Sequence, residues 1–217
     1  MNFLKQIICK FRSYRLSQNI DSGGGKITVT DPWLKVSIVK APNSEFVLKG
    51  ELKISPYSGG NAPVYIGLGI GAKLAINGDF ILGHGVSMTL SNNASLTFGG
   101  KKNESGSGIT ANTMIKANKK IEIGYDFMCA WDVFITDSDW HAIEGQYHQA
   151  DVSIGNHVWV ANSNNVLKGV SIGNNCIVAS NSKVINRTFE DDSLIGGIPG
   201  KVLKTGVNWC RDLPPSS

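Results

Sequence analysis

The chain has 217 residues and a net charge of +4, and 41% of its residues are hydrophobic, which is a globular composition sufficient for one buried core. The small charge, without a basic stripe interleaved with aromatic residues, does not indicate a nucleic-acid partner. Four scattered cysteines contain no CxxC pair, so neither a zinc site nor a disulfide framework is expected and the cytoplasm is the default location.

The first predicted element is a basic amphipathic segment, residues 1–25. No acidic residue precedes Asp21. One helical stripe holds the apolar residues Phe3, Ile7, Phe11 and Tyr14. Three interpretations stay open: the helix packs on the open end of the domain, residues 1–20 lie on a membrane surface at the inner face of the membrane, or the segment is disordered.

Residues 26–204 are predicted to form one β domain. Strand-like runs in residues 26–60 have a poor register and are expected to form irregular first coils. Apolar residues then recur every sixth position in two ladders, the first being Val64, Ile70, Ile76, Leu82 and Met88. The second ladder is Ile109, Ile115, Ile121, Phe127 and Val133. The glycine-rich residues 99–108, where the phase slips, indicate a turn or surface loop.

The clearest pattern is a repeat of eighteen residues near the C-terminus. Val152–Gly169 and Val170–Arg187 align without a gap and share eight of eighteen residues. An α-helix cannot place every sixth residue on one face, whereas three short strands per coil can stack such residues along one axis. The pattern therefore predicts an all-β chain, a parallel β-helix of hexapeptide repeats. A β-sandwich would instead show alternation of period two between hairpin turns.

A surface excursion interrupts this stack at residues 136–151. Ile123-Gly124 and Ile154-Gly155 open equivalent coils but lie 31 residues apart, so about thirteen residues are extra. The excursion contains His141, preceded by Asp137 and Asp139. A histidine beside carboxylates is suited to take a proton near neutral pH, and loops on rigid scaffolds are where function concentrates.

From residue 123 to residue 204 the chain resembles the catalytic half of the hexapeptide-repeat acetyltransferases. The resemblance rests on IGNHVWVANSNNVLKGVSIGNNCIVASNSKVI followed by IGGIPGKVLK. The most similar members act on capsule, sialic-acid and O-antigen sugars, and share the D-x-H before the insertion and the tail tryptophan Trp209. Ala161 and Gly200 depart from the family pattern, each being a small residue in place of another small one. The resemblance implies a left-handed β-helix with short helical termini, a tail at residues 205–217, and a homotrimer.

The same resemblance implies an acetyl-CoA-dependent O-acetyltransferase. His141 matches the general base that removes a proton from a sugar hydroxyl, with Asp139 or Asp137 orienting it. Trp159 matches the tryptophan beside the acetyl and pantetheine end of acetyl-CoA. Asn162 and Ser180 match positions that line the pantetheine channel.

Two further groups complete the expected site. Lys201 and Lys204 match basic residues near the phosphates of acetyl-CoA, which need cations. Trp140, Tyr147 and His148 are candidate contacts of a sugar or glycan acceptor. No metal is expected. Capsule or lipopolysaccharide glycans are the favoured acceptors, while a small free sugar, an antibiotic or a nucleotide sugar remains the alternative.

Two functions of other classes are weighed against this prediction. A zinc enzyme would need His141, His148 and His157 to converge, but their spacing does not match that of β-helix zinc enzymes, and His157 is expected to be a solvated turn residue because the next repeat has Asn175 there. A non-catalytic scaffold would not need the excursion with its histidine.

Overall fold

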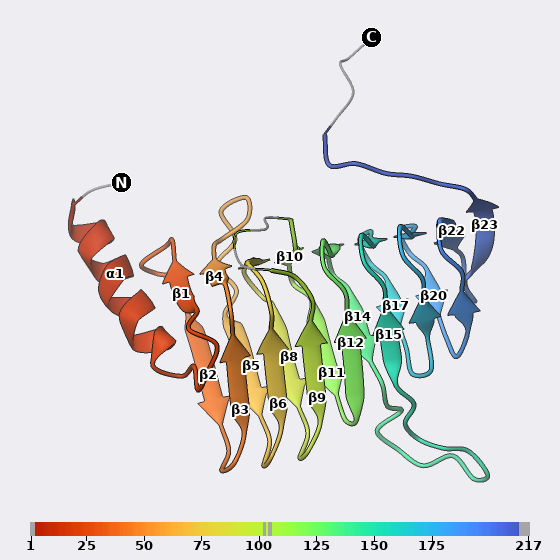
Figure 1. The fold of residues 1–217 in the computed structure, drawn as a ribbon, viewed down its shortest axis with the longest axis horizontal. Coiled ribbons are helices and arrows are strands. Elements are labelled where there is room, and N and C mark those ends of the chain that lie inside the picture. The colour runs from red at the N-terminus through yellow and green to blue at the C-terminus, as the bar shows by residue number, and fades with distance from the viewer. Residues whose placement is uncertain (1–2, 102, 104–105, 213–217) are drawn as a thin grey trace.

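The computed structural model describes residues 3–101, 103 and 106–212 as one helix followed by a stack of short strands (Figure 1). Successive strands turn a corner and join three sheets in rotation, and parallel pairing relates each coil to the next. The first sheet contains β1 (Lys26–Val29), β4 (Glu51–Ile54), β7 (Phe80–Leu82), β10 (Gly108–Ala111), β13 (Met128–Trp131), β16 (Trp159–Val160), β19 (Ile177–Val178), β22 (Ser193–Gly196) and β23 (Lys201–Thr205).

The other two sheets run beside it. The second contains β2 (Val36–Lys40), β5 (Val64–Leu68), β8 (Ser87–Leu90), β11 (Met114–Ala117), β14 (Phe134–Thr136), β17 (Asn165–Val166) and β20 (Lys183–Val184). The third contains β3 (Glu45–Leu48), β6 (Lys73–Ile76), β9 (Ser95–Phe98), β12 (Lys120–Ile123), β15 (Val152–Ile154), β18 (Ser171–Ile172) and β21 (Thr188–Phe189). We call the three edges between them the 1–2, 2–3 and 3–1 corners.

The predicted apolar ladders form the core of this stack. Ile154 pairs with Ile172, eighteen residues later, and both are buried, as the repeat requires. In the N-terminal half the coils are longer, since Phe46 pairs with Leu74. The residues expected to be irregular therefore form a regular first coil, because longer strands and corners change the period but not the stacking. Ile70 is 50% exposed in a turn, so its place in the first ladder was wrong.

The corners are tight because each coil rests directly on the next. A Cβ added at Gly155 would lie 2.7 Å from the backbone of Gly173, so the glycine that opens both repeats is required by this close approach. Left-handed turn residues also stack at the 3–1 corner, where Asp126, His157 and Asn175 all have φ near +54°.

The two ends of the stack are closed differently. Helix α1 (Phe3–Ser17) covers the first coil, as expected, whereas β23 at the other end pairs antiparallel with β22 (Figure 1). A short helix was expected at both termini, and the described C-terminal residues form a strand and an extended tail instead. Pairing with β23 removes the free edge that β22 would otherwise present. Within the described residues, no helix combines the length and apolar character needed to cross a bilayer.

Candidate active site

The excursion between β14 and β15 is held to the scaffold by a buried carboxylate. Asp137 is fully buried, and its oxygens accept hydrogen bonds of 2.7, 2.8 and 2.7 Å from the backbone amides of Asn118, Lys119 and Lys120. These donors belong to the corner of the preceding coil. Asp137 therefore anchors the loop rather than orienting His141, because its carboxylate is already occupied by backbone donors.

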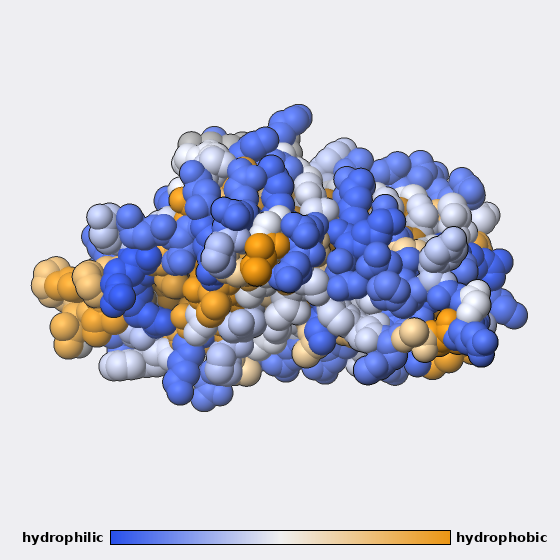
Figure 2. All heavy atoms as spheres, turned by 90° about the horizontal axis from the view of Figure 1, so that it is seen from below, coloured by the Kyte–Doolittle hydropathy of each residue, from blue (hydrophilic) through white to orange (hydrophobic). Residues whose placement is uncertain are grey.

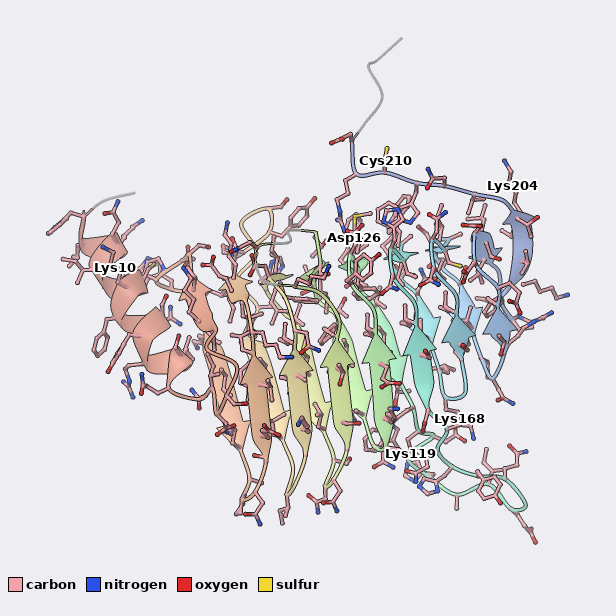
Figure 3. All side chains as sticks on the ribbon, in the orientation of Figure 1. Lys10, Lys119, Asp126, Lys168, Lys204 and Cys210 are labelled. Carbon is pink, nitrogen blue, oxygen red and sulfur yellow. The ribbon has the colours of Figure 1, made fainter. Side chains whose placement is uncertain are left out.

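The stem of the loop has further attachments on both sides. Asp139 forms an ion pair with Lys168, which also donates 2.6 Å to the carbonyl of Tyr147. The amide of Asp139 donates 2.7 Å to the carbonyl of His148, and Lys119 pairs with Asp151 at 2.7 Å. Figure 3 labels Lys119 and Lys168 beside this loop. These contacts fix the two ends of the loop, and the residues between Asp139 and Tyr147 project from them.

The projecting tip carries the candidate base and acceptor contacts. His141 is exposed, and within the described residues its ring has no hydrogen bond or ion pair. Tyr147 is 91% exposed and His148 is also exposed. Trp140 lies partly against the stem, with Lys116 4.5 Å from its ring centroid and its indole NH donating 3.1 Å to Thr136. The loop presents His141 outward, and no carboxylate of the described residues pairs with it.

Replacing Asp137 by alanine is expected to destabilise the protein by about 2–4 kcal/mol, because three backbone amides lose the buried carboxylate that accepts their hydrogen bonds. The melting temperature would then fall by roughly 5–10 °C. The matched control is Asp151→Ala, which removes an exposed ion pair and should change the melting temperature little. If the melting temperature is unchanged but the turnover number falls, Asp137 acts in catalysis and not as an anchor of the loop.

Trp159 lies on the first sheet, away from the loop. It begins β16, pairs with Met128 and Ile177 on neighbouring coils, and is half-buried. The ring of Trp209 from the C-terminal tail lies 6.0 Å away, measured between centroids. The exposed part of the Trp159 ring therefore forms an aromatic wall together with the tail.

The tail returns along the 3–1 corner and touches the coils in reverse order (Figure 1). Asn175 donates 3.0 Å to the carbonyl of Val207, and the ring of His157 bonds the carbonyl of Trp209 at 3.0 Å. Arg211 then pairs with Asp126 at 2.6 Å. These contacts use Asn175, His157 and Asp126, the left-handed residues that stack at the 3–1 corner. The tail is therefore a strap that runs along this corner.

His157 is the centre of this strap, and its interpretation as a solvated turn residue was wrong. Its ring stacks on Trp209 with centroids 4.1 Å apart and bonds the carboxylate of Asp126 through Nδ1. Both ring nitrogens thus face hydrogen-bond acceptors, the carboxylate of Asp126 at Nδ1 and the carbonyl of Trp209 at Nε2. Burial by itself raises the pKa of Asp126, but hydrogen bonds from Arg211 and His157 outweigh it and leave the pKa below its usual value.

Sequence reasoning missed this group because its members are far apart in the chain. The one available signal was the alignment of Gly124-Tyr125-Asp126 with Gly155-Asn156-His157, which places an acid directly beneath the histidine. Nothing in the spacing indicated that Arg211 would return to the same corner.

The remaining predicted cofactor residues lie on other parts of the stack. Asn162 accepts a 2.7 Å hydrogen bond from Ser180 of the next coil at the 1–2 corner. Lys201 and Lys204 are exposed on β23, and neither has an acidic partner among the described residues. These lysines are available to an anionic ligand, and the two polar residues form part of an outward-facing corner.

One chain does not bring His141 and Trp159 together. The loop leaves at the 2–3 corner, whereas Trp159 follows the 3–1 corner, and Figure 3 shows the loop and Asp126 on opposite edges. A face about five residues wide, at ~3.3 Å per residue, separates these corners by roughly 15–20 Å. A site that uses both residues needs a second chain.

A cavity of about 280 Å³ lies over β7, β10 and β13, on the same sheet as Trp159. Its lining includes Tyr57, Thr110, Met128 and Arg211. Tyr57 stacks on Trp131 with ring centroids 6.4 Å apart and an interplanar angle of 16°. Both aromatic residues are about half exposed, and the Tyr57 ring gives the cavity one flat apolar wall with polar groups at its edge, while Trp131 lies outside the lining.

The three histidines of the zinc alternative do not converge. His141 and His148 lie on the loop, whereas His157 is bound to Asp126 and Trp209 at another corner. The described residues also contain no cluster of three or more histidine, cysteine or acidic side chains placed to hold a metal ion.

No protein-family model matches the sequence, and no curated protein matches it either. Among solved structures, the polysialic acid O-acetyltransferase OatWY is 25% identical, with a TM-score of 0.51 over 90% of this chain and 93% of that chain. The polySia-specific acetyltransferase NeuO is 19% identical, with a TM-score of 0.46 over 86% of this chain and 89% of that chain. The chain thus has a left-handed parallel β-helix like that of a polysialic acid O-acetyltransferase over nearly its whole length, which confirms its resemblance to the hexapeptide-repeat acetyltransferases.

Proposed function

We propose that this protein transfers an acetyl group from acetyl-CoA to a hydroxyl group of a glycan, with His141 as the general base. The observation that carries the proposal is the loop: a buried anchor fixes its stem while an unpaired histidine projects from its tip. The similarity to OatWY over 90% of the chain supports the reaction class. Such an enzyme would work in the cytoplasm, where acetyl-CoA is made.

The proposed reaction needs a single transfer step. His141 accepts the proton of the acceptor hydroxyl as that oxygen attacks the carbonyl carbon of the thioester. The carbon–sulfur bond then breaks, and the leaving sulfur takes the proton from His141. No covalent enzyme intermediate is required because the thioester is already an activated acyl donor. A backbone amide near Asn162 is the proposed donor to the developing oxyanion.

The proposed donor site runs from Trp159 towards the C-terminal coils. The half-buried Trp159 ring offers an apolar surface to the acetyl and pantetheine end, and Asn162 and Ser180 lie at the next corner. Lys201 and Lys204 stand exposed beyond them on β23 and would meet the phosphates.

Neutralising both lysines, by Lys201→Gln and Lys204→Gln, is expected to raise the Michaelis constant for acetyl-CoA roughly 10-fold or more with little change in turnover number. Steady-state kinetics and calorimetry measure the two effects. The matched control is the double variant Lys49→Gln and Lys53→Gln, which removes the same charge from exposed positions near the other end. Equal acetyl-CoA affinity in both double variants would remove Lys201 and Lys204 from the site.

We further propose a homotrimer in which the site lies between subunits. The separation of the His141 loop from Trp159 within one chain supports this arrangement, because a neighbouring loop placed over the first sheet would bring the two together. Closed threefold symmetry also covers the exposed tip and prevents open-ended stacking.

The acceptor is proposed to occupy the cavity beside Tyr57. It lies one coil beyond Trp159 towards the N-terminus, on the side opposite the two lysines. The Tyr57 ring, which is stacked on Trp131, suits the apolar face of a sugar ring, while Thr110 and Arg211 offer polar contacts. Trp140, Tyr147 and His148 of a neighbouring loop would close the cavity from above.

The proposal is tested by incubating the protein with acetyl-CoA and a panel of acceptors, and measuring the mass gain of one acetyl group. The expected result is acetylation of a capsule or lipopolysaccharide glycan with release of free CoA thiol. If only a small free sugar, an antibiotic or a nucleotide sugar is acetylated, the proposed acceptor is wrong but the proposed enzyme class stands. Absence of transfer to every acceptor class, by folded protein that binds acetyl-CoA, would contradict the proposal.

A further inference from the structure

Helix α1 turns its apolar stripe towards solvent. The exposed fractions are Phe3 76%, Leu4 62%, Ile7 47%, Phe11 60% and Tyr14 67%. Figure 2 shows hydrophobic residues gathered at the end of the molecule that α1 caps. The helix packs on the open end of the domain, as one interpretation of the sequence predicts, but through its other face, so the fold leaves this apolar stripe uncovered.

The opposite face of α1 fixes this orientation by polar contacts. The hydroxyl groups of Ser13 and Ser17 accept 2.9 Å hydrogen bonds from the backbone amides of Val29 and Ile27. Arg12 donates 2.6 Å to the carbonyl of Pro32. The two serine bonds satisfy amides of the edge strand β1, so rotating the helix to bury its apolar stripe would leave those strand amides without partners.

Cations border the exposed stripe on both sides. At 100° per residue, Lys10 lies on one edge of the stripe and Arg15 on the other, and both are exposed. The helix contains no acidic residue, and the described part of the chain gives neither side chain an ion pair. An apolar band between cationic margins matches the layers of a bilayer surface, where acyl chains lie beneath anionic headgroups.

We propose that α1 is a membrane-surface helix, which lies flat on an anionic bilayer with its apolar stripe among the acyl chains. A second copy of the chain is the less suitable occupant. A two-fold contact of α1 with itself would set the same cations against each other without any acid to pair them. Anionic lipid neutralises these cations and covers the apolar band together.

The test is flotation of the full-length protein with vesicles of neutral phosphatidylcholine, or of phosphatidylcholine containing phosphatidylglycerol. The wild type should float with the anionic vesicles, and binding should fall as salt is raised. The double variant Ile7→Ser and Phe11→Ser should lose at least about tenfold in binding. The double variant Lys10→Gln and Arg15→Gln should bind neutral and anionic vesicles almost equally.

A matched control replaces Ile70 and Ile185 by serine, because both are comparably exposed but lie outside the helix. This control should float like the wild type. The proposal is overturned if the wild type stays with the soluble fraction, or if the Ile7 and Phe11 variant floats as well as the control. It is equally overturned if that variant changes only the mass in solution, which would identify a protein contact. Flotation measures vesicle binding alone, so its outcome does not depend on the proposed enzyme function. Acetyl transfer to a soluble acceptor should be unchanged in every helix variant.

Discussion

Replacing His141 by alanine is expected to lower the turnover number by roughly 100-fold to 10,000-fold, because the acceptor hydroxyl loses the group that takes its proton. The side chain is exposed at the loop tip, and among the described residues it has no hydrogen bond or ion pair. Its removal should therefore leave the melting temperature and the affinity for acetyl-CoA nearly unchanged. Steady-state kinetics, thermal unfolding and calorimetry separate these effects.

The control for this variant is Gln146→Ala, which truncates another exposed side chain of the same loop. It should retain most of the wild-type turnover, since the loop stem is held by Asp137 and Lys168 and not by the tip. If His141→Ala keeps more than about a tenth of the wild-type turnover, His141 is not the base.

Mixing two inactive variants is expected to restore about a quarter of the wild-type activity if the site is shared between subunits. His141→Ala and Trp159→Ala are each expected to form inactive homotrimers. In a randomly mixed trimer, an interface is intact when the chain with a native His141 faces the chain with a native Trp159. About one interface in four meets that condition after random exchange.

The experiment requires unfolding and refolding the two variants together, with each variant refolded alone as the control. Light scattering should give a mass near three times the 23.3 kDa chain in all samples. A site within one chain would show no recovery on mixing, because each chain would still lack one of its two residues. A fully active monomer would contradict both the trimer and the shared site.

The eighteen-residue repeat determined the C-terminal coils and the position of the loop. Ile154 and Ile172 belong to one ladder in the sequence and to one pair of strands in the structure. This was predictable because each coil contacts only its neighbours, so a local pattern is sufficient to define the stacking. The same reasoning failed at Ile70, since the N-terminal coils have longer corners that break the period without disturbing the stack.

The sequence by itself therefore determined the parallel β-helix and the presence of an exposed histidine on a loop. Only the tertiary structure decided which way α1 faces, what Asp137 binds, and where the tail returns. Each of these depends on groups that are distant in the chain. Backbone amides of β1 bond the polar face of α1, and the backbone amide of Lys119 bonds Asp137. Asp126 forms an ion pair with Arg211 of the tail. A one-dimensional pattern records which residues are apolar, but not which distant polar groups require a partner.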